Sequence, residues 1–233
     1  MLVAAQFKVY IMIKRRQFLT GSAALSIMPL AACSTTTEAL DPTVRSEPSV
    51  PSNYKSMYGP LPKERFPIPG IDLDRVPRKF WRREVSFPTK YPVGTIIVDT
   101  SSYYLHLVQA NGKAMRYGVG LGRQGFEWSG EGVIQWKQKW PTWTPPAEMI
   151  SRQPELEKWS AANGGQPPGL GNALGARALY IFQDGKDTLY RIHGTPEFWT
   201  IGKSVSSGCV RMINHDVIDL YGRASGKNRL VVL

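Results

Sequence analysis

The sequence predicts a mainly β domain over residues 93–233, of the sandwich or barrel-like kind, with one or two short helices. Two observations predict this class. Short runs rich in β-branched and aromatic residues recur along this part of the chain, as is typical of half-buried strands. Turn signals separate the runs while helical patterns are few, and this combination favours an all-β architecture.

The expected elements follow one another along the chain. Asn111-Gly112 and Asp184-Gly185 are typical of tight hairpins. One helix is expected to begin at Asn214, whose side chain would cap it, and to end near Ala224. Asp216 would lie in its first turn, where the helix dipole favours an acid. Strands are expected at residues 94–99, 103–109, 113–120, 131–138, 178–182, 188–192 and 230–233.

Residues 1–33 are expected to form an export signal. Arg15 and Arg16 precede an apolar run, residues 21–29, that is shorter than the roughly 20 residues needed to span a bilayer. The arginine pair resembles twin-arginine signals, and Leu-Ala-Ala-Cys at residues 30–33 resembles the lipobox of bacterial lipoproteins. We therefore expect a periplasmic protein that is either lipidated on Cys33 or cleaved before it without a lipid.

Residues 34–92 are expected to form a flexible tether followed by an extended arm. The stretch is rich in Ser, Thr and Pro. Because proline fixes φ and lacks an N–H donor, long helices and central strands are disfavoured there. The aromatic residues between Tyr54 and Phe87 are too many for a pure linker, so we expect this part to pack on the surface of the domain.

A Trp- and Pro-rich insertion interrupts the strand pattern between residues 136 and 175. It holds four of the chain's seven tryptophans. A long insertion in a compact domain is usually functional, and aromatic faces suit sugar rings and peptide backbones. The sequence leaves open whether it is a lid or a loop packed down by its own tryptophans.

The chain is basic, with a formal net charge of +11. Four of the positive charges lie in residues 1–32, which hold no acid, so +7 remains for residues 33–233. Such a surface suits an anionic partner, although a merely solubilising surface accounts for it equally well. Nucleic acid is not an expected partner, because the sequence carries none of the usual signatures. Membrane contact is expected only through the N-terminal signal or a lipid.

Cys209 and His193 are the candidate catalytic pair. Cys209 is the one cysteine outside the signal, and a thiol with no second cysteine to form a disulfide in an exported protein is a candidate nucleophile. His193 closes an apolar run sixteen positions earlier and could be the base that forms the thiolate. Gly208 permits a tight turn whose N–H groups could form an oxyanion hole. In an extended segment Arg211 would share a face with Cys209.

Simpler interpretations compete with this pair. A lone cysteine is most often a small buried hydrophobe. A zinc site made by His193, Cys209 and His215 lacks the usual ligand spacing. His106 is expected to be structural and His215 to be exposed near the start of the helix. No metal and no cofactor is expected.

The segments around the pair resemble a known family. His193-Gly194-Thr195, followed by the run from Ser206 to Met212, is similar to the signature of the L,D-transpeptidase catalytic domain, the YkuD-like family, over roughly residues 93–233. Residues 143–150, 171–175 and 191–195 are similar to segments of its proteobacterial branch. Many members carry a histidine where Ser207 stands here, so any role of that histidine is not carried over.

The resemblance implies a β-rich sandwich-like fold and a set of site residues. The implied nucleophile is Cys209 and the implied base is His193. The other implied roles are oxyanion or orienting residues at Gly194, Ser207 and Gly208, and substrate binding at Arg211 and Ser206.

The resemblance also implies a reaction in the cell wall. An acyl group would be taken from a peptidoglycan tetrapeptide stem, with release of the terminal D-alanine, and passed to an amine of a second stem peptide, an anchored envelope protein or a free D-amino acid. Acylation of Cys209 by carbapenems is expected as well. Two alternatives remain, namely an L,D-carboxypeptidase in which water resolves the same thioester and a non-catalytic wall-binding lipoprotein.

Overall fold

The computed structural model describes residues 50–122, 129–206 and 208–233. Their strands are β1 (Arg83–Ser86), β2 (Ile96–Asp99), β3 (Tyr104–Val108), β4 (Lys113–Gly118), β5 (Leu121–Gly122), β6 (Gly130–Lys139), β7 (Arg177–Gln183), β8 (Lys186–Thr195), β9 (Ser204–Ser206), β10 (Val210–Ile213) and β11 (Arg229–Val232). The helices are α1 (Ser52–Met57), α2 (Ala147–Arg152) and α3 (Asn214–Arg223), with 3₁₀ turns η1 (Leu73–Arg75), η2 (Arg78–Phe80), η3 (Pro154–Trp159), η4 (Ala161–Asn163) and η5 (Phe198–Thr200). The mainly β class expected from the sequence is confirmed.

Nine strands form one mixed sheet in the order β1-β4-β3-β2-β11-β6-β7-β8-β10, and β5 pairs with β9 in a second sheet. Strand β11 joins two groups of strands, because it pairs in parallel with β2 on one side and antiparallel with β6 on the other. At the end of the sheet β10 pairs in parallel with β8. The remaining neighbours in the large sheet are antiparallel.

Both hairpin signals in the sequence are confirmed. Asn111 and Gly112 join β3 to β4 with φ angles of 59° and 64°, and Asp184 and Gly185 join β7 to β8 with φ angles of 50° and 76°. Two successive left-handed residues match the right-handed twist of the flanking strands.

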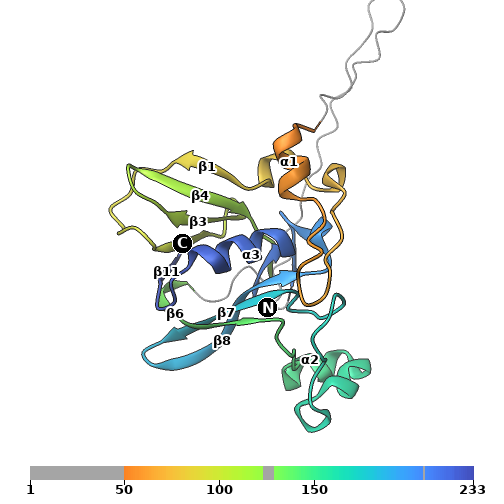
Figure 1. The fold of residues 1–233 in the computed structure, drawn as a ribbon. Helices are drawn as coiled ribbons and strands as arrows, with labels where there is room; N and C mark the ends of the chain where they lie inside the picture. The colour runs from red at the N-terminus through yellow and green to blue at the C-terminus, as the bar shows by residue number, and fades with distance from the viewer. Residues whose placement is uncertain (1–49, 123–128, 207) are drawn as a thin grey trace, which may run out of the picture. The chain divides into compact units, whose positions relative to one another are not determined.

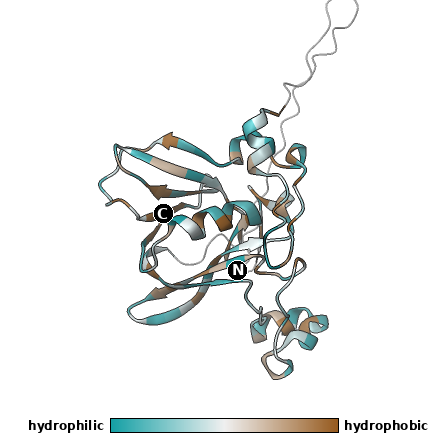
Figure 2. Ribbon diagram, in the orientation of Figure 1, coloured by the Kyte–Doolittle hydropathy of each residue, from teal (hydrophilic) through white to brown (hydrophobic). Residues whose placement is uncertain are grey.

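The main core surrounds α3, which lies between the β1–β4–β3 part of the sheet and the β6–β7–β8 part (Figure 1). Figure 2 shows hydrophobic and hydrophilic residues along this helix. Val217 and Leu220 are fully buried against side chains from both parts of the sheet. The buried strand residues of this cluster are Ile96, Val98, Leu105, Leu107, Tyr117, Leu121, Ile134, Leu179, Ile181, Ile192, Val210, Met212, Leu230 and Val232.

The start of α3 differs from the sequence-based expectation. Asn214 is the first helical residue, and no side chain caps the helix. The Asn214 Oδ1 instead accepts the backbone N–H of Ala176 at 2.9 Å, a contact across 38 positions that local pattern does not reveal. His215 was expected to be exposed, but it is buried, with its Nε2 2.8 Å from the Gly59 carbonyl oxygen.

The arm is more tightly packed than an extended surface segment. Tyr58, Phe80 and Trp81 are buried and form one cluster with Ile201 and Ile213 of the domain. The arm also supplies β1 to the edge of the large sheet. Its residues therefore pack against segments on either side of Cys209.

The insertion begins after β6, so Trp136 belongs to the strand and is 44% exposed on it. Trp140 is buried with Ile68 of the arm, and Trp143 packs against Leu174. These two tryptophans hold the base of the insertion against the rest of the protein. Within the described ranges, no helix has the length and apolar character needed to cross a bilayer.

Polar contacts hold α3 to the arm and to β4. Tyr58 donates to Asp216 Oδ2 at 3.2 Å, and Arg82 lies 3.2 Å from Asp219. Tyr117 donates to Asp219 at 2.7 Å. Burial raises the pKa of Asp216 to about 7, although the nearby Arg82 and the Tyr58 hydrogen bond oppose the shift. The helix thus has a fully buried carboxyl group that is costly to ionise.

Replacing Asp216 with Asn is expected to change how stability depends on pH. The folded-state pKa lies above that of the unfolded chain, so the folded state binds more protons between about pH 4 and pH 7. Wild-type stability therefore gains from this group as the pH falls through that window, whereas Asp216→Asn, which mimics the neutral form, does not. The measurement is the difference in melting temperature between the two proteins at pH 8, 6.5 and 5. A difference that stays constant with pH would contradict the assignment.

Candidate active site

The parallel pair of β8 and β10 brings the candidate residues together. Arg211 pairs with His193 in register, and Val210 pairs with Ile192. Continuing the register by one residue places Cys209 beside Arg191. Val210 and Ile192 point into the main core. Because side chains alternate along a strand, His193 and Arg211 lie on the opposite face of the sheet. Arg191 and Cys209 come two residues before them, so the same alternation puts them on that face as well.

These four residues form a patch in which the cysteine and histidine occupy one diagonal and the two arginines the other. Both arginine charges act on both members of the pair: each lowers the pKa of His193 and that of Cys209. The predicted pair thus lies together, in a local field that is positive.

His193 is held in one orientation by its own neighbour in the chain. Its Nδ1 lies 2.6 Å from the Gly194 carbonyl oxygen, and the side chain is 5% exposed. A carbonyl oxygen only accepts, so Nδ1 carries the proton and the neutral ring leaves Nε2 as the base. Burial lowers the pKa of His193 to about 4, against the opposing effect of the Gly194 hydrogen bond.

Cys209 is half-buried at the end of a constrained turn. Burial raises the pKa of its thiol above the ordinary value, while a backbone hydrogen bond from Arg191 and the two arginine charges oppose the shift. Gly208 before it has a φ of 119°, in the region that favours glycine, and a Cβ there would lie 3.0 Å from the Tyr190 ring. The turn that presents the thiol therefore requires glycine.

Arg211 is fixed by both its backbone and its side chain. Its backbone N–H and C=O pair with Gly120, and its Nη1 donates to Glu197 Oε2 at 3.0 Å. Its Nε is buried and has no partner among the described residues.

Close packing behind His193 explains two glycines that local pattern alone left unexplained. A Cβ on Gly175 or on Gly194 would overlap Oδ1 of Asn214. The backbone on both sides of His193 is thereby held against the end of the insertion and the start of α3. Sequence reasoning missed Asn214 in this role because its position before a helix suggested a cap instead.

Arg191 is the second residue that sequence reasoning missed. Both Nη atoms bond to the two Asp187 oxygens at 2.7 and 2.8 Å, and the guanidinium lies over the Tyr180 ring at 4.4 Å. The signal that could have found it is its position two residues before His193 in a strand, which places both on one face.

The structure leaves several predicted positions untested. Ser206 belongs to β9, but its side chain, like Ser207 and Cys33 as a whole, lies outside the described residues. Among the residues that the structure describes, no group of three or more His, Cys, Asp or Glu side chains could hold a metal ion.

Comparison with known proteins identifies the family of this chain. Residues 94–232 match the model of YkuD, the L,D-transpeptidase catalytic domain. The Escherichia coli K12 protein named probable L,D-transpeptidase ErfK/SrfK is 28% identical over 59% of this chain and 43% of its own length. Probable L,D-transpeptidase YbiS of the same strain is 36% identical over 44% of this chain and 32% of its own length. The chain thus spans less than half the length of these curated relatives.

A solved structure from Brucella melitensis, named as a probable carnitine operon oxidoreductase, is 44% identical over 70% of this chain and 99% of that chain. Its TM-score against this chain is 0.47. The family match covers more than half of this chain and contains both His193 and Cys209. The chain belongs to the L,D-transpeptidase catalytic domain family.

Proposed function

We propose that this protein is a peptidoglycan L,D-transpeptidase in which Cys209 is the nucleophile and His193 the base. The observation that carries the proposal is the parallel register of β8 and β10, which sets both residues in one patch of an L,D-transpeptidase domain. The Nδ1 contact with Gly194 supports the role of Nε2 as proton acceptor.

The resting pair is neutral in this proposal. A pKa near 4 disfavours the imidazolium by about 3 kcal/mol relative to a free histidine, and the raised pKa of Cys209 disfavours the thiolate. Proton transfer from the thiol to His193 therefore accompanies attack on the substrate, when the developing charge moves to the substrate oxygen.

In the proposed reaction, Sγ of Cys209 bonds to the carbonyl carbon before the terminal D-alanine, and its proton passes to Nε2 of His193. Collapse of the adduct breaks the C–N bond, and the same proton goes to the leaving nitrogen. An acceptor amine then attacks the thioester, gives a proton to Nε2 and displaces the thiol, which is reprotonated. Backbone N–H groups at the Gly208 turn are the proposed oxyanion donors.

We propose in the same way the roles of the other predicted residues and of the N-terminal segment. Arg211 and Ser206 bind substrate, and the acceptor is a second stem peptide, a free D-amino acid or an anchored envelope protein. Residues 1–33 export the chain to the periplasm, where Cys33 is lipidated. The basic character of residues 33–233 suits an anionic wall polymer.

Cys209→Ala is expected to lower turnover of a disaccharide-tetrapeptide at least about a thousand-fold, because no other group can form the thioester. Product mass spectrometry of the full chain beside the variant is the measurement, with a D-amino acid added as acceptor. Cross-linked dimers or exchange products, lost in the variant, support the transpeptidase. Release of D-alanine without coupling identifies a carboxypeptidase. Wall binding by both proteins without any product would indicate a non-catalytic module.

The neutral pair predicts how Cys209 reacts with iodoacetamide. The pKa of the thiol lies above its ordinary value, so the neutral form persists to higher pH and alkylation should be slow at pH 5–7. The rate should rise through a single step only at a pH above the ordinary pKa of a thiol. Peptide mapping measures the alkylation of Cys209 separately from that of Cys33. A rate plateau between pH 5 and pH 7 would instead show a preformed thiolate–imidazolium pair and contradict the mechanism.

A further inference from the structure

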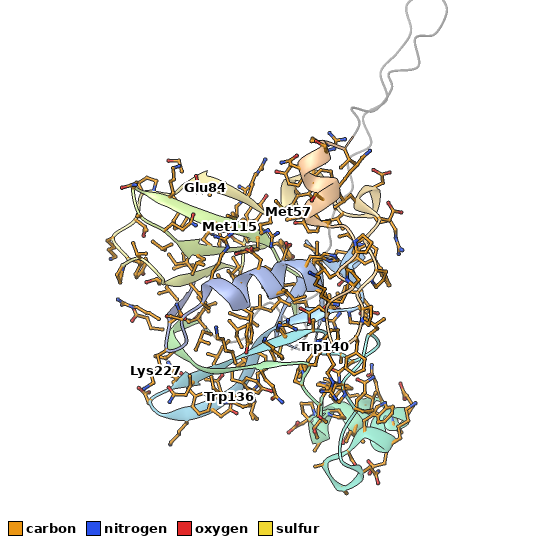
Figure 3. All side chains as sticks on the ribbon, in the orientation of Figure 1. Met57, Glu84, Met115, Trp136, Trp140 and Lys227 are labelled. Atoms are coloured by element: carbon orange, nitrogen blue, oxygen red, sulfur yellow. The ribbon has the colours of Figure 1, made fainter. Side chains whose placement is uncertain are left out.

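A row of stacked side chains leads to the catalytic patch along the face that His193 shares. Trp136 of β6 pairs with Tyr180 of β7, which pairs with Arg191 of β8. The Trp136 and Tyr180 rings lie 3.6 Å apart and nearly parallel, and the guanidinium of Arg191 lies 4.4 Å from the centre of the Tyr180 ring. Figure 3 labels Trp136 at the β6 end of this row, which ends at Arg191, beside Cys209 in register.

Arg191 is held more firmly than a surface arginine. Asp187 takes one N–H from each Nη atom, and Nη1 also donates to the Tyr190 carbonyl at 2.8 Å. The side chain is 13% exposed, so its position is constrained while part of it remains reachable. Stacking on Tyr180 fixes the plane of the guanidinium.

Among the described residues, this arrangement leaves one edge of the guanidinium for a ligand. Three of its five N–H groups are used by the contacts just described, and the other two, on Nε and Nη2, form the edge that matches a carboxylate in a two-point contact. Arg211 differs, because its Nε is buried without a partner among the described residues and its Nη1 is paired with Glu197. Of the two arginines beside the pair, Arg191 is therefore the one that can offer this two-point edge to a carboxylate.

We infer that Arg191 binds the terminal carboxylate of the residue that leaves during acylation, and so makes the enzyme specific for stem peptides that end one residue after the scissile bond. This inference rests on the proposed function. Arg191 is thus a specificity-determining residue in the donor site, held in place by Asp187 and Tyr180.

The chemistry of the donor sets the required position. Only the nitrogen and one Cα separate the scissile carbonyl from the carboxylate of a terminal residue, so the anion must lie within a few ångströms of Sγ of Cys209. Neighbouring strands lie about 4.8 Å apart, and Arg191 is near enough to Cys209 for its charge to act on the thiol. A stem with one further residue would present a neutral amide to Arg191 instead.

The test compares two tetrapeptide donors, one ending in D-alanine and one in D-alanine amide, with kcat and KM measured for each. Wild type should favour the acid in kcat/KM by about 10- to 100-fold, the effect of a charge-assisted hydrogen bond. Arg191→Gln should lose this preference because kcat/KM falls for the acid donor alone. Arg191→Lys should keep part of the preference. The acid-to-amide ratio is independent of the folded fraction, so partial unfolding of a variant does not affect the conclusion.

Arg229→Gln is the matched control, because Arg229 also pairs with a carboxylate, donating from Nη2 to both Glu131 oxygens, but lies on β11. It should retain the wild-type ratio. An equal loss of kcat/KM on both peptides in Arg191→Gln would show a structural role and overturn the inference. A wild type with equal kcat/KM on both peptides would overturn it as well. A wild type that processes neither peptide would refute the proposed function itself, and the inference with it.

Discussion

The parallel pairing of β8 with β10 is the interaction on which the site depends. His193 and Cys209 are sixteen residues apart, and nothing in their local sequence brings them together. The register of the pair does so, since it sets Arg211 opposite His193 while Val210 and Ile192 are buried in the core. A slip of one residue would turn the functional side chains inward and the apolar ones outward. Core packing therefore specifies the geometry of the site.

Burial and charge oppose each other at Cys209 but act together at His193. Removing His193 and Cys209 from water disfavours their charged forms, while two nearby arginines favour a negative thiolate and disfavour a positive imidazole. In the proposed mechanism the resting pair therefore stores no separated charge, within a field already suited to an anion. Such a preorganised field costs no rearrangement during the reaction.

Local signals in the sequence predicted β2, β3, β4, β6, β7, β8, β11 and α3 but not β1, β10, α1 or α2, and they predicted the long-range contacts poorly. The two hairpins at Asn111-Gly112 and Asp184-Gly185 were predictable because their residues favour a left-handed backbone. The pairing of β11 between β2 and β6 was not, since nothing local records which strands become neighbours. Asn214 and His215 were misjudged for the same reason: their partners, Ala176 and Gly59, are distant in sequence. At the site, His193 and Cys209 stood out by residue type, whereas Arg191 became apparent only once register and stacking were known.

The position of β11 has a consequence for how the protein acquires its structure. This strand follows all the others in sequence, yet it lies in the middle of the large sheet and joins its two groups of strands. During synthesis those groups can pair internally, but they cannot be joined until residues 229–232 have emerged. Closure therefore has to wait for contacts that span more than a hundred residues, such as that of Leu230 with Ile96. Folds dominated by such distant pairings form slowly, and their unpaired strand edges remain exposed to other chains in the meantime.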